Sequence, residues 1–408
     1  MHVLLIHQAF AALDEPGGTR HHELSRCLAA RGHSVTIIAS PISYLTGHPI
    51  NLRDPRSTKQ EGDPGITVRR AYTYPAFHRS FFHRVISFLS FMISSFFIAL
   101  TVPDVDLVWG TSPPIFQAGT SWLLSAVRRA PFVLEVRDLW PAFAVEVGVL
   151  RQPLLIRAAE AYERFLYRKA DLVIVNSPGF IDRVARLGAR QVEVVPNGSD
   201  TAMFDPARDG NQFRQENNLE GKFIVLYAGA HGLSNDLGVV LEAASKLIDQ
   251  PEIAFVLVGD GKEKPRLQAR AQDMGLYNVL FLPPVPKINM PDVLAAADAC
   301  LAILKPVPLY GTVYPNKVFD YMAAGRPVIL AMTGVIRSLV ESAQSGVAVD
   351  PGDPHALASA VQHLVAHPED ALKMGLNGRR LIQERFNRQV LGDRFAQILE
   401  NLVESNKV

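Results

Sequence analysis

Residues 3–38 read VLLIHQAFAALDEPGGTRHHELSRCLAARGHSVTII, which is the pattern of one β-α-β unit. The short apolar runs at 3–6 and 35–38 are typical of buried strands, whereas residues 20–31 have the apolar spacing of a helix. Gly32 follows this segment and suits the left-handed position at which many helices end. Strands that alternate with helices in this way predict a parallel sheet covered by helices.

The same alternation continues along the chain. The first half has further predicted strands at 66–70, 107–109, 132–134, 172–175 and 192–195. After a polar stretch at 205–221 the alternation restarts, with a helix from about Leu237 and strands predicted at 223–227, 254–258, 279–282, 300–304 and 328–330. We therefore predict two Rossmann-like, doubly wound α/β domains.

The length of 408 residues also favours two domains, because single cores rarely grow that large. We predict an N-terminal domain at 1–203, a linker at 204–221 and a C-terminal domain at 222–385. The polar composition of the linker, with Pro, Gly, Asn and Gln, supports this division. The last segment, 386–408, has helical apolar spacing, and it either packs on its own domain or crosses back to the first.

Composition excludes several classes of protein. The net charge of +1 argues against a strongly basic nucleic-acid-binding surface. Cys27 and Cys300 are the only cysteines, so a disulfide framework has no support and a reducing compartment fits. The first residues read as a strand rather than as a signal peptide. We expect a cytoplasmic protein.

Residues 85–102, VISFLSFMISSFFIALTV, form an apolar segment without a charged side chain. As a helix it would be about 27 Å long, slightly less than the roughly 30 Å of a bilayer core. Because it lies between two predicted strands of one sheet, spanning a membrane would separate those strands. Ser87, Ser90 and Ser94 recur at helical spacing and are expected to face the protein. The large apolar residues lie elsewhere around the helix: Phe88, Phe91, Met92, Phe96 and Ile98.

Two interpretations of this segment remain. It is either a buried crossover helix or a monotopic helix seated in the membrane face, and we favour the second. Nearby Arg79 and Arg84 would then touch anionic lipid headgroups.

Residues 315–329, PNKVFDYMAAGRPVI, read as loop, helix, glycine stop and strand. Asn316 is the expected N-cap, and Lys317 and Asp320 share one helix face. A carboxylate suits a ribose diol, and an ammonium suits a phosphate. The alternative is an exposed intrahelical salt bridge, worth about 0.3–0.5 kcal/mol.

This segment resembles the nucleotide-sugar motif of retaining family-four glycosyltransferases with the GT-B fold. It is especially similar to bacterial surface-polysaccharide enzymes of the N-acetylfucosamine type, whose pattern reads PSKLFEYMA. Other markers follow in the family's order along the chain: PGGTRH at 16–21, RGH at 31–33, RDLWP at 137–141, VPNG at 195–198, YAG at 227–229 and VGDG at 258–261. The resemblance implies metal-independent sugar transfer with retained anomeric configuration, from a donor held in a cleft between two facing domains.

The chain departs from the family at two places. Thr312 stands where relatives carry the first of two glutamates, and Asp320 stands at the second. Ala230 and Asn235 occupy positions where many relatives place Arg and Lys against the diphosphate. We therefore assign that charge to Lys317, with Lys264 as a second candidate.

Several loops are further candidates for donor binding. Gly17 and Gly18 precede a helix and let backbone N–H groups approach phosphates, unless they form a plain loop. The loop from Gly229 to Gly232 is expected to present backbone N–H groups to phosphates in the same way. His231 in this loop either donates a hydrogen bond to the nucleotide-sugar or is an ordinary turn histidine. The resemblance places Val285, in the loop 283–286, against the nucleobase.

Arg137 and Asp138 follow a predicted strand at the edge where ligands of doubly wound sheets bind. We predict that they act near the transferred sugar and the acceptor, and the alternative is a structural ion pair. Arg20 and His21, in the first helical turn, are weaker acceptor candidates. Glu135 is expected to be structural.

We predict a retaining hexosyltransferase that uses neither a metal nor another cofactor. It would move an N-acetylated (deoxy)hexose from a UDP-sugar to a lipid-linked saccharide in surface-polysaccharide, lipopolysaccharide or O-antigen synthesis, as a peripheral protein on the inner face of the plasma membrane. A nucleotide-sugar epimerase is one alternative. A non-catalytic nucleotide-sugar-binding assembly partner is another, which the missing glutamate favours.

Overall fold

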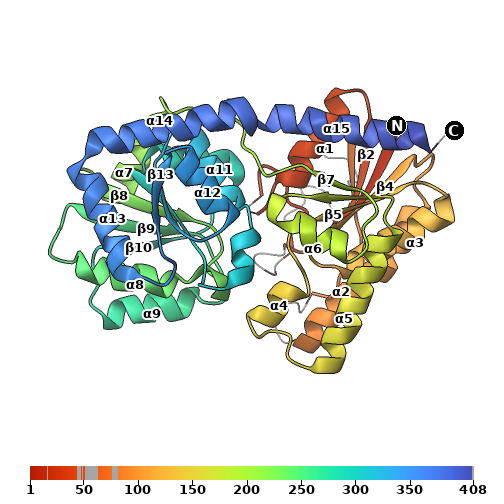
Figure 1. Ribbon diagram of the computed structural model, residues 1–408, viewed down its shortest axis with the longest axis horizontal. Coiled ribbons are helices and arrows are strands. Elements are labelled where there is room, and N and C mark those ends of the chain that lie inside the picture. The colour runs from red at the N-terminus through yellow and green to blue at the C-terminus, as the bar shows by residue number, and fades with distance from the viewer. Residues whose placement is uncertain (16, 44–46, 48, 51–62, 76–80, 407–408) are drawn as a thin grey trace. The chain divides into compact units, whose positions relative to one another are not determined.

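The computed structural model describes residues 1–15, 17–43, 47, 49–50, 63–75 and 81–406. The chain forms two compact α/β units (Figure 1). Unit 1 comprises 1–12, 17–196 and 389–408, and unit 2 comprises 13–16 and 197–388. Each unit is built on one parallel sheet, which confirms the predicted pair of doubly wound domains.

Unit 1 contains a seven-stranded sheet in the order β3-β2-β1-β4-β5-β6-β7. Its strands are β1 (His2–Ile6), β2 (Ser34–Ala39), β3 (Ile66–Arg70), β4 (Leu107–Ser112), β5 (Phe132–Val136), β6 (Leu172–Val175) and β7 (Val192–Val194). Its helices are α1 (Arg20–Ala30), α2 (Phe81–Leu100), α3 (Phe116–Arg128), α4 (Ala142–Glu146), α5 (Pro153–Lys169), η1 (Pro178–Phe180), α6 (Ile181–Arg186) and α15 (Arg388–Ser405).

Alternate residues of β1 face two different cores. Val3 and Leu5 pack with α1 and α15, whereas Leu4 and Ile6 pack with α2 and α3. Gly32 adopts a φ of +84° directly after α1, as the sequence predicts. Helices therefore cover both faces of the sheet.

The C-terminal helix α15 packs on unit 1. The Phe395 ring lies 4.8 Å from the Trp109 ring on β4. A Cβ on Gly392 would lie 2.2 Å from the Cys27 sulfur, so the glycine lets α15 approach α1 closely. Leu399 is also buried in this core.

Helix α2 is long and apolar enough to cross a membrane, yet only 22% of its apolar window is buried. Ser87 is buried, Ser90 accepts a hydrogen bond from Tyr74 N, and Ser94 donates one to the Tyr72 carbonyl. These serines face the protein, as predicted. Phe91 is fully buried in the core beneath the helix, so the inner side of α2 is apolar as well.

Unit 2 contains a six-stranded sheet in the order β10-β9-β8-β11-β12-β13. Its strands are β8 (Phe223–Ala228), β9 (Ile253–Val258), β10 (Val279–Leu282), β11 (Ala299–Ile303), β12 (Val328–Ala331) and β13 (Gly346–Val349). Its helices are α7 (Asn211–Glu216), η2 (Leu233–Asn235), α8 (Leu237–Lys246), α9 (Lys264–Asp273), η3 (Lys287–Asn289), α10 (Met290–Ala295), η4 (Pro308–Thr312), α11 (Asn316–Ala323), α12 (Val335–Ser342), α13 (Pro354–Ala366) and α14 (Pro368–Arg385).

The predicted linker at 204–221 is part of unit 2. Phe204 and Leu219 are buried, and the stretch contains helix α7. The chain instead passes between the units after Pro196. Polar composition was misleading here because this surface segment is anchored by a few apolar side chains.

Candidate functional site

The loops that follow β8 and β9 in unit 2 approach each other closely. Gly229 and Gly259 both adopt a φ of +149°, which favours glycine. A Cβ on Gly259 would lie 1.9 Å from the Gly229 carbonyl oxygen. These loops lie at the carboxyl ends of the strands, where doubly wound sheets bind ligands.

Lys317, on α11, lies against this loop. A Cβ on Gly229 would be 2.6 Å from its Nζ, and the Nζ is 3.7 Å from the centre of the Tyr227 ring. Among the described residues Lys317 has no carboxylate partner. Burial lowers the pKa of Lys317 to about 7. A desolvated ammonium beside a glycine loop is suited to bind an anion.

His231 follows in the same loop and is fully buried. Burial, with help from Lys264 and Lys317, lowers its pKa to about 4, so the ring is neutral at pH 7. Its ring lies 6.1 Å from Phe281 and 6.0 Å from Tyr227. The predicted role of His231 toward a donor stays a prediction.

Lys264 differs from Lys317 in its surroundings. Its Nζ donates to the carbonyls of Gly259 and Leu282, at 2.7 and 2.9 Å. It therefore ties together the ends of β9 and β10. An incoming phosphate would have to compete with these carbonyls.

Asp320 is buried and already has several polar partners. Its Oδ1 accepts a hydrogen bond from Ser199 Oγ at 2.7 Å, and its Oδ2 forms an ion pair with Lys287 and accepts from Asn316 Nδ2 at 3.4 Å. The alternative considered above, a salt bridge between Lys317 and Asp320, does not form, because Lys317 lies against Tyr227. A ribose diol at Asp320 would have to share or displace these partners.

Asn316 is not the N-cap of α11, contrary to prediction. The helix begins at Asn316, Pro315 occupies the cap position, and no side chain caps the helix. The Asn316 amide instead bonds to Asp320 and accepts from Arg388 Nη2 at 3.3 Å. Proline was overlooked because it lacks a capping side chain.

Lys287 is the residue of this site that the sequence did not reveal. It is buried at the start of η3, directly after the loop that contains half-buried Val285, and its Nζ lies 4.9 Å from the centre of the Phe204 ring. The pair of Lys287 and Asp320 therefore joins this loop to α11. Thr312 lies in η4, where its hydroxyl donates a hydrogen bond to the Leu309 carbonyl at 2.7 Å.

In unit 1, Arg20 and His21 belong to a buried ionic cluster. Glu135 on β5 lies 2.7 Å from Arg20 Nε and 2.8 Å from His21 Nε2. Arg20 also donates to the carbonyls of Val195 and Pro196. Although burial opposes it, the two partners hold the pKa of Glu135 below its ordinary value. The cluster fastens α1 to the sheet, and the acceptor role of Arg20 and His21 stays a prediction.

Arg137 and Asp138 follow β5 at the carboxyl edge. Arg137 donates to Thr111 Oγ1 at 3.0 Å and to the Pro113 carbonyl at 2.7 Å. Burial raises the pKa of Asp138 to about 6, against the opposing effect of Arg137. Among the described residues, no hydrogen bond or ion pair engages the Asp138 carboxyl, so the structural ion pair considered above is not observed.

His7 is a further polar group at this edge. It directly follows β1, it is fully buried, and its ring lies 4.1 Å from the His21 ring. Burial and then His21 lower its pKa well below the ordinary value. Its position at the end of the first strand was the signal that could have identified it.

Gly17 and Gly18 lie exposed just before α1. Gly17 has a φ of +152°, and a Cβ on Gly18 would meet nothing within 4 Å. The space beside Gly18 is therefore open, whereas a Cβ on Gly17 would lie 2.9 Å from the Cβ of Ala11. Their predicted contact with donor phosphates stays a prediction.

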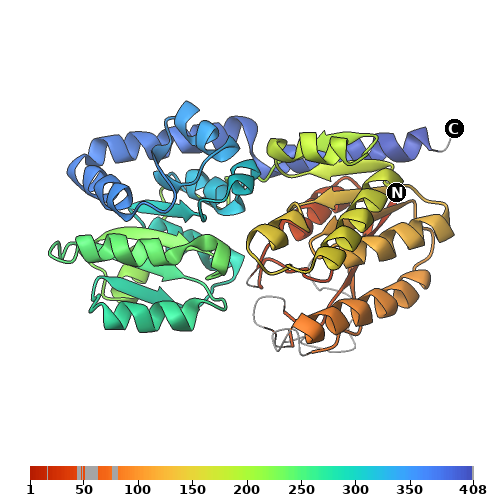
Figure 2. The same ribbon diagram turned by 60° about the horizontal axis from the view of Figure 1, so that its bottom comes forward.

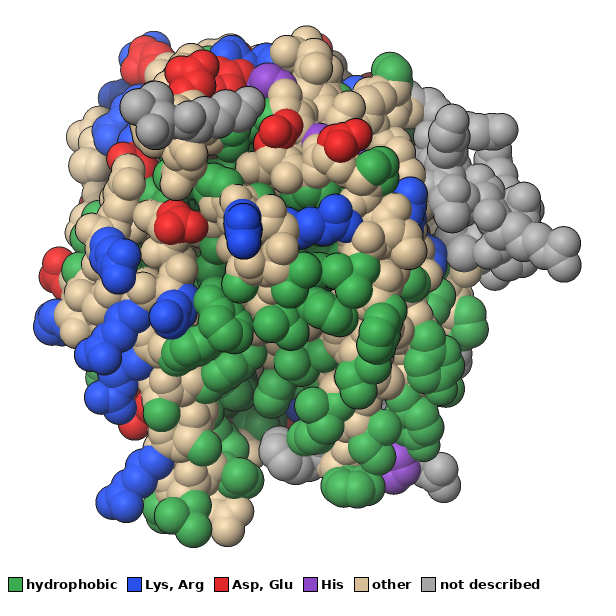
Figure 3. All heavy atoms as spheres, turned by 90° about the vertical axis from the view of Figure 1, so that its right-hand side faces the viewer, with side chains coloured by type: hydrophobic (Ala, Val, Ile, Leu, Met, Phe, Trp, Pro, Cys, Tyr) green, Lys and Arg blue, Asp and Glu red, His purple; other side chains and the backbone are tan. Residues whose placement is uncertain are grey.

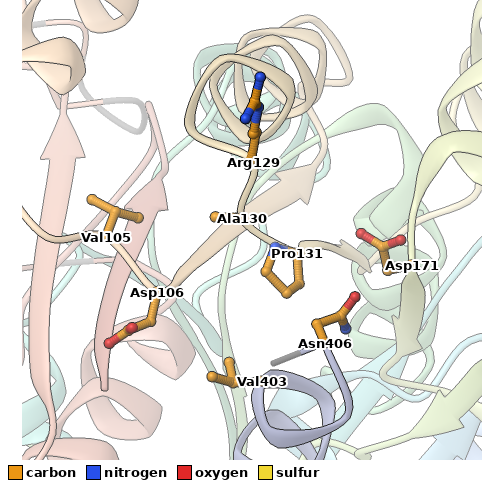
Figure 4. Close-up of a pocket in the computed structure, with 8 residues that line it drawn as sticks. All are labelled: Val105, Asp106, Arg129, Ala130, Pro131, Asp171, Val403 and Asn406. Atoms are coloured by element: carbon orange, nitrogen blue, oxygen red, sulfur yellow. The ribbon is translucent and has the colours of Figure 1, made fainter. Parts of the chain in front are cut away.

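A pocket of about 300 Å³ lies at the opposite, amino edge of the unit 1 sheet (Figure 4). Its carboxylates cap strand backbones, since Asp106 accepts from His2 N and Asp171 accepts from Phe132 N, both at 2.7 Å. Asp104 and Asp106 form an Asp-x-Asp sequence here, although we expected the chain to contain none. The described residues contain no group of three or more His, Cys, Asp or Glu side chains that could hold a metal.

Two doubly wound sheets, each with glycine loops or polar groups at its carboxyl edge, define the GT-B class of glycosyltransferases. The fold is similar to sucrose-phosphate synthase from Thermosynechococcus elongatus, with a TM-score of 0.79, 22% identity and 99% of both chains covered. It is also similar to Anabaena Alr3699/HepE in complex with UDP and glucose, with a TM-score of 0.73, 18% identity and coverage of 98% of this chain and 100% of that one.

The sequence identifies the family. The model described as "Glycosyl transferase 4-like domain" matches residues 17–198, and the model described as "Glycosyl transferases group 1" matches residues 222–367. The chain belongs to this family of glycosyltransferases. A relative from Escherichia coli K12, "Putative colanic acid biosynthesis glycosyl transferase WcaI", is 28% identical over 91% of this chain and 94% of its own.

The buried pair of Lys287 and Asp320 predicts strong energetic coupling. Asp320→Asn leaves a buried ammonium without its countercharge and should destabilise unit 2 by about 3 kcal/mol. The double variant Lys287→Met/Asp320→Asn should lose less than the sum of the two single variants, as measured by calorimetry. Additive losses would show that the pair is not coupled, and exposed Lys246→Met serves as the control.

The burial of Asp138 predicts a pH-dependent loss of stability. Its folded pKa of about 6 exceeds its ordinary 3.8, so folding loses free energy as pH rises through this window. Asp138→Asn should therefore be more stable than wild type at about pH 7.5 by about 1 kcal/mol, after allowance for partial exposure, and by less at about pH 4.

Urea unfolding followed by tryptophan fluorescence measures this difference in unit 1 alone, because Trp109, Trp122 and Trp140 all lie there. The exposed Asp182→Asn should show no such pH dependence. An equal advantage of Asp138→Asn at both pH values would contradict the assignment.

Proposed function

We propose that this protein is a retaining glycosyltransferase that moves an N-acetylated (deoxy)hexose from a UDP-sugar to a lipid-linked saccharide of a surface polysaccharide. The position of Lys317 against the Gly229 loop carries this proposal. A positive charge that is desolvated, and that has no carboxylate partner among the described residues, is suited to a diphosphate. The UDP and glucose in the Anabaena structure support a UDP donor.

The chemical step follows from this placement. The acceptor hydroxyl oxygen forms a bond to the anomeric carbon on the face from which the diphosphate departs, as the bond from that carbon to the phosphate oxygen breaks. The hydroxyl proton passes to the departing diphosphate. Lys317 stabilises the negative charge that develops, and no metal ion is required.

We assign acceptor binding to unit 1. Asp138 is a carboxyl that other side chains of the described chain do not engage, and it lies at the carboxyl edge of the sheet. Above a pH of about 6 its carboxylate can accept a hydrogen bond from the acceptor hydroxyl and orient it. Because a lipid-linked acceptor resides in the membrane, we place the enzyme at the inner face of the cytoplasmic membrane. The colanic acid relative supports a polysaccharide product.

Donor binding should depend on the charge of Lys317. With a pKa of about 7, its ammonium is mostly charged at about pH 6 and mostly neutral at about pH 8.5. Wild type should therefore bind UDP-N-acetylglucosamine about tenfold more weakly at the higher pH, as measured by calorimetry. The diphosphate of this probe carries no titrating group in this range.

Lys317→Met should bind weakly at both pH values, and Lys246→Met, which removes an exposed lysine, should behave like wild type. If Lys317→Met retained wild-type affinity and pH dependence, another group would bind the phosphate.

The reaction itself is tested with a panel of UDP-sugars and a polyprenyl-diphosphate-linked saccharide in detergent. Mass spectrometry should detect addition of one sugar, and NMR should show the donor's anomeric configuration in the product. Lys317→Ala should reduce kcat/KM by about 100-fold or more. A new nucleotide-sugar formed without acceptor would indicate an epimerase, and donor binding without any product would indicate an assembly partner.

A further inference from the structure

The outer side of α2 carries a stripe of large apolar side chains. Phe97, Ile93 and Phe82 are 64%, 62% and 69% exposed, and Leu89 and Leu100 lie on the same side. The helix differs from an ordinary surface helix, because Phe91 packs in the core beneath it and large apolar side chains also cover its outer side. The medium outside α2 is therefore expected to be less polar than water.

The apolar surface extends beyond α2. Figure 2 shows α2, α3 and α5 side by side in unit 1. Phe88 on α2 stacks on Phe116 of α3 at 5.3 Å, and Trp122 on α3 packs against Phe165 of α5 at 4.7 Å. Exposed apolar side chains continue onto α3 and the start of α5 (Leu123, Val127, Leu154 and Leu155). We call this surface the α2–α3–α5 face.

Positive charges border this face. Figure 3 shows a continuous field of hydrophobic side chains with Lys and Arg along its upper and left borders, while most Asp and Glu lie farther up. Arg128 marks one border at the end of α2, where it donates to the carbonyls of Leu100 and Val102. Arg129 and the α5 residues Arg157, Arg164 and Arg168 are exposed. Neither α2 nor α3 contains an acidic residue.

We propose that the α2–α3–α5 face docks on an anionic lipid bilayer, with the α2 stripe seated among the acyl chains and the border arginines at the headgroups. This proposal rests on the proposed function only for the reason why the protein would bind a membrane. The apolar field supplies insertion, and the basic border complements anionic headgroups. Arg79, which the sequence analysis assigned to this contact, lies outside the described residues.

Two other occupants fit this face less well. In a symmetric dimer this face would meet its own copy, and neither α2 nor α3 offers an acidic residue to pair with the basic border. A transmembrane α2 is also unsuitable, because α2 joins β3 to β4 in one parallel sheet and its inner side packs on that sheet. A bilayer surface meets both constraints.

Vesicle flotation without any sugar substrate tests the proposal separately from the reaction. Wild type should bind POPC vesicles with about 30% POPG about tenfold or more tightly than pure POPC vesicles, and about 0.5 M NaCl should weaken this binding. Ile93→Glu/Phe97→Glu should lower binding about tenfold or more. Arg164→Glu/Arg168→Glu should lower the preference for POPG.

Leu372→Glu/Leu376→Glu is the matched control, since these residues of α14 have the same spacing and are 64% and 52% exposed. It should bind vesicles like wild type. Thermal melting followed by circular dichroism checks that each variant is folded in both units. Undiminished vesicle binding by Ile93→Glu/Phe97→Glu would overturn the proposal. So would a wild-type dimer in light scattering that this variant converts to a monomer, because the face would then join two copies.

Discussion

The candidate donor site depends on the close approach of the backbone at the ends of β8 and β9. Neither Gly229 nor Gly259 has room for a Cβ, because the loops and the Lys317 ammonium already fill that space. The crowding keeps Lys317 against the Tyr227 ring, where water solvates its charge poorly. An ammonium that has already lost water gains more from an incoming anion than a solvated one does.

The two lysines near α11 illustrate what determines the use of a buried charge. Lys287 meets the Asp320 carboxylate, so its charge is neutralised within the protein and serves to join two segments of unit 2. Lys317 has no carboxylate partner among the described residues and meets the Tyr227 ring, which stabilises a cation without neutralising it. Of the two, Lys317 therefore retains the positive charge that can act on a ligand. Family resemblance alone would not have separated these roles.

The fold could be predicted from sequence because parallel strands buried on both faces are short apolar runs, as in β1 and β9. Strand β13, GVAV, was missed because Gly346 and Ala348 give it a weaker strand signal than other four-residue strands such as β10, VLFL. Lys317 and Gly229 were identifiable because helix and loop spacing is local. Lys287 was not, because its partner Asp320 is 33 residues away and only the folded sheet brings them together.

The topology of unit 1 relates the proposed membrane-binding face to the proposed acceptor site. Helix α2 begins after the carboxyl end of β3 and ends before the amino end of β4, so its Phe82 end lies toward the sheet edge that carries His7 and Asp138. The Leu100 end lies toward the opposite edge. A bilayer bound along α2 would thus extend to the edge at which we place the acceptor. A saccharide attached to a membrane lipid could then reach Asp138 while its lipid stays in the bilayer.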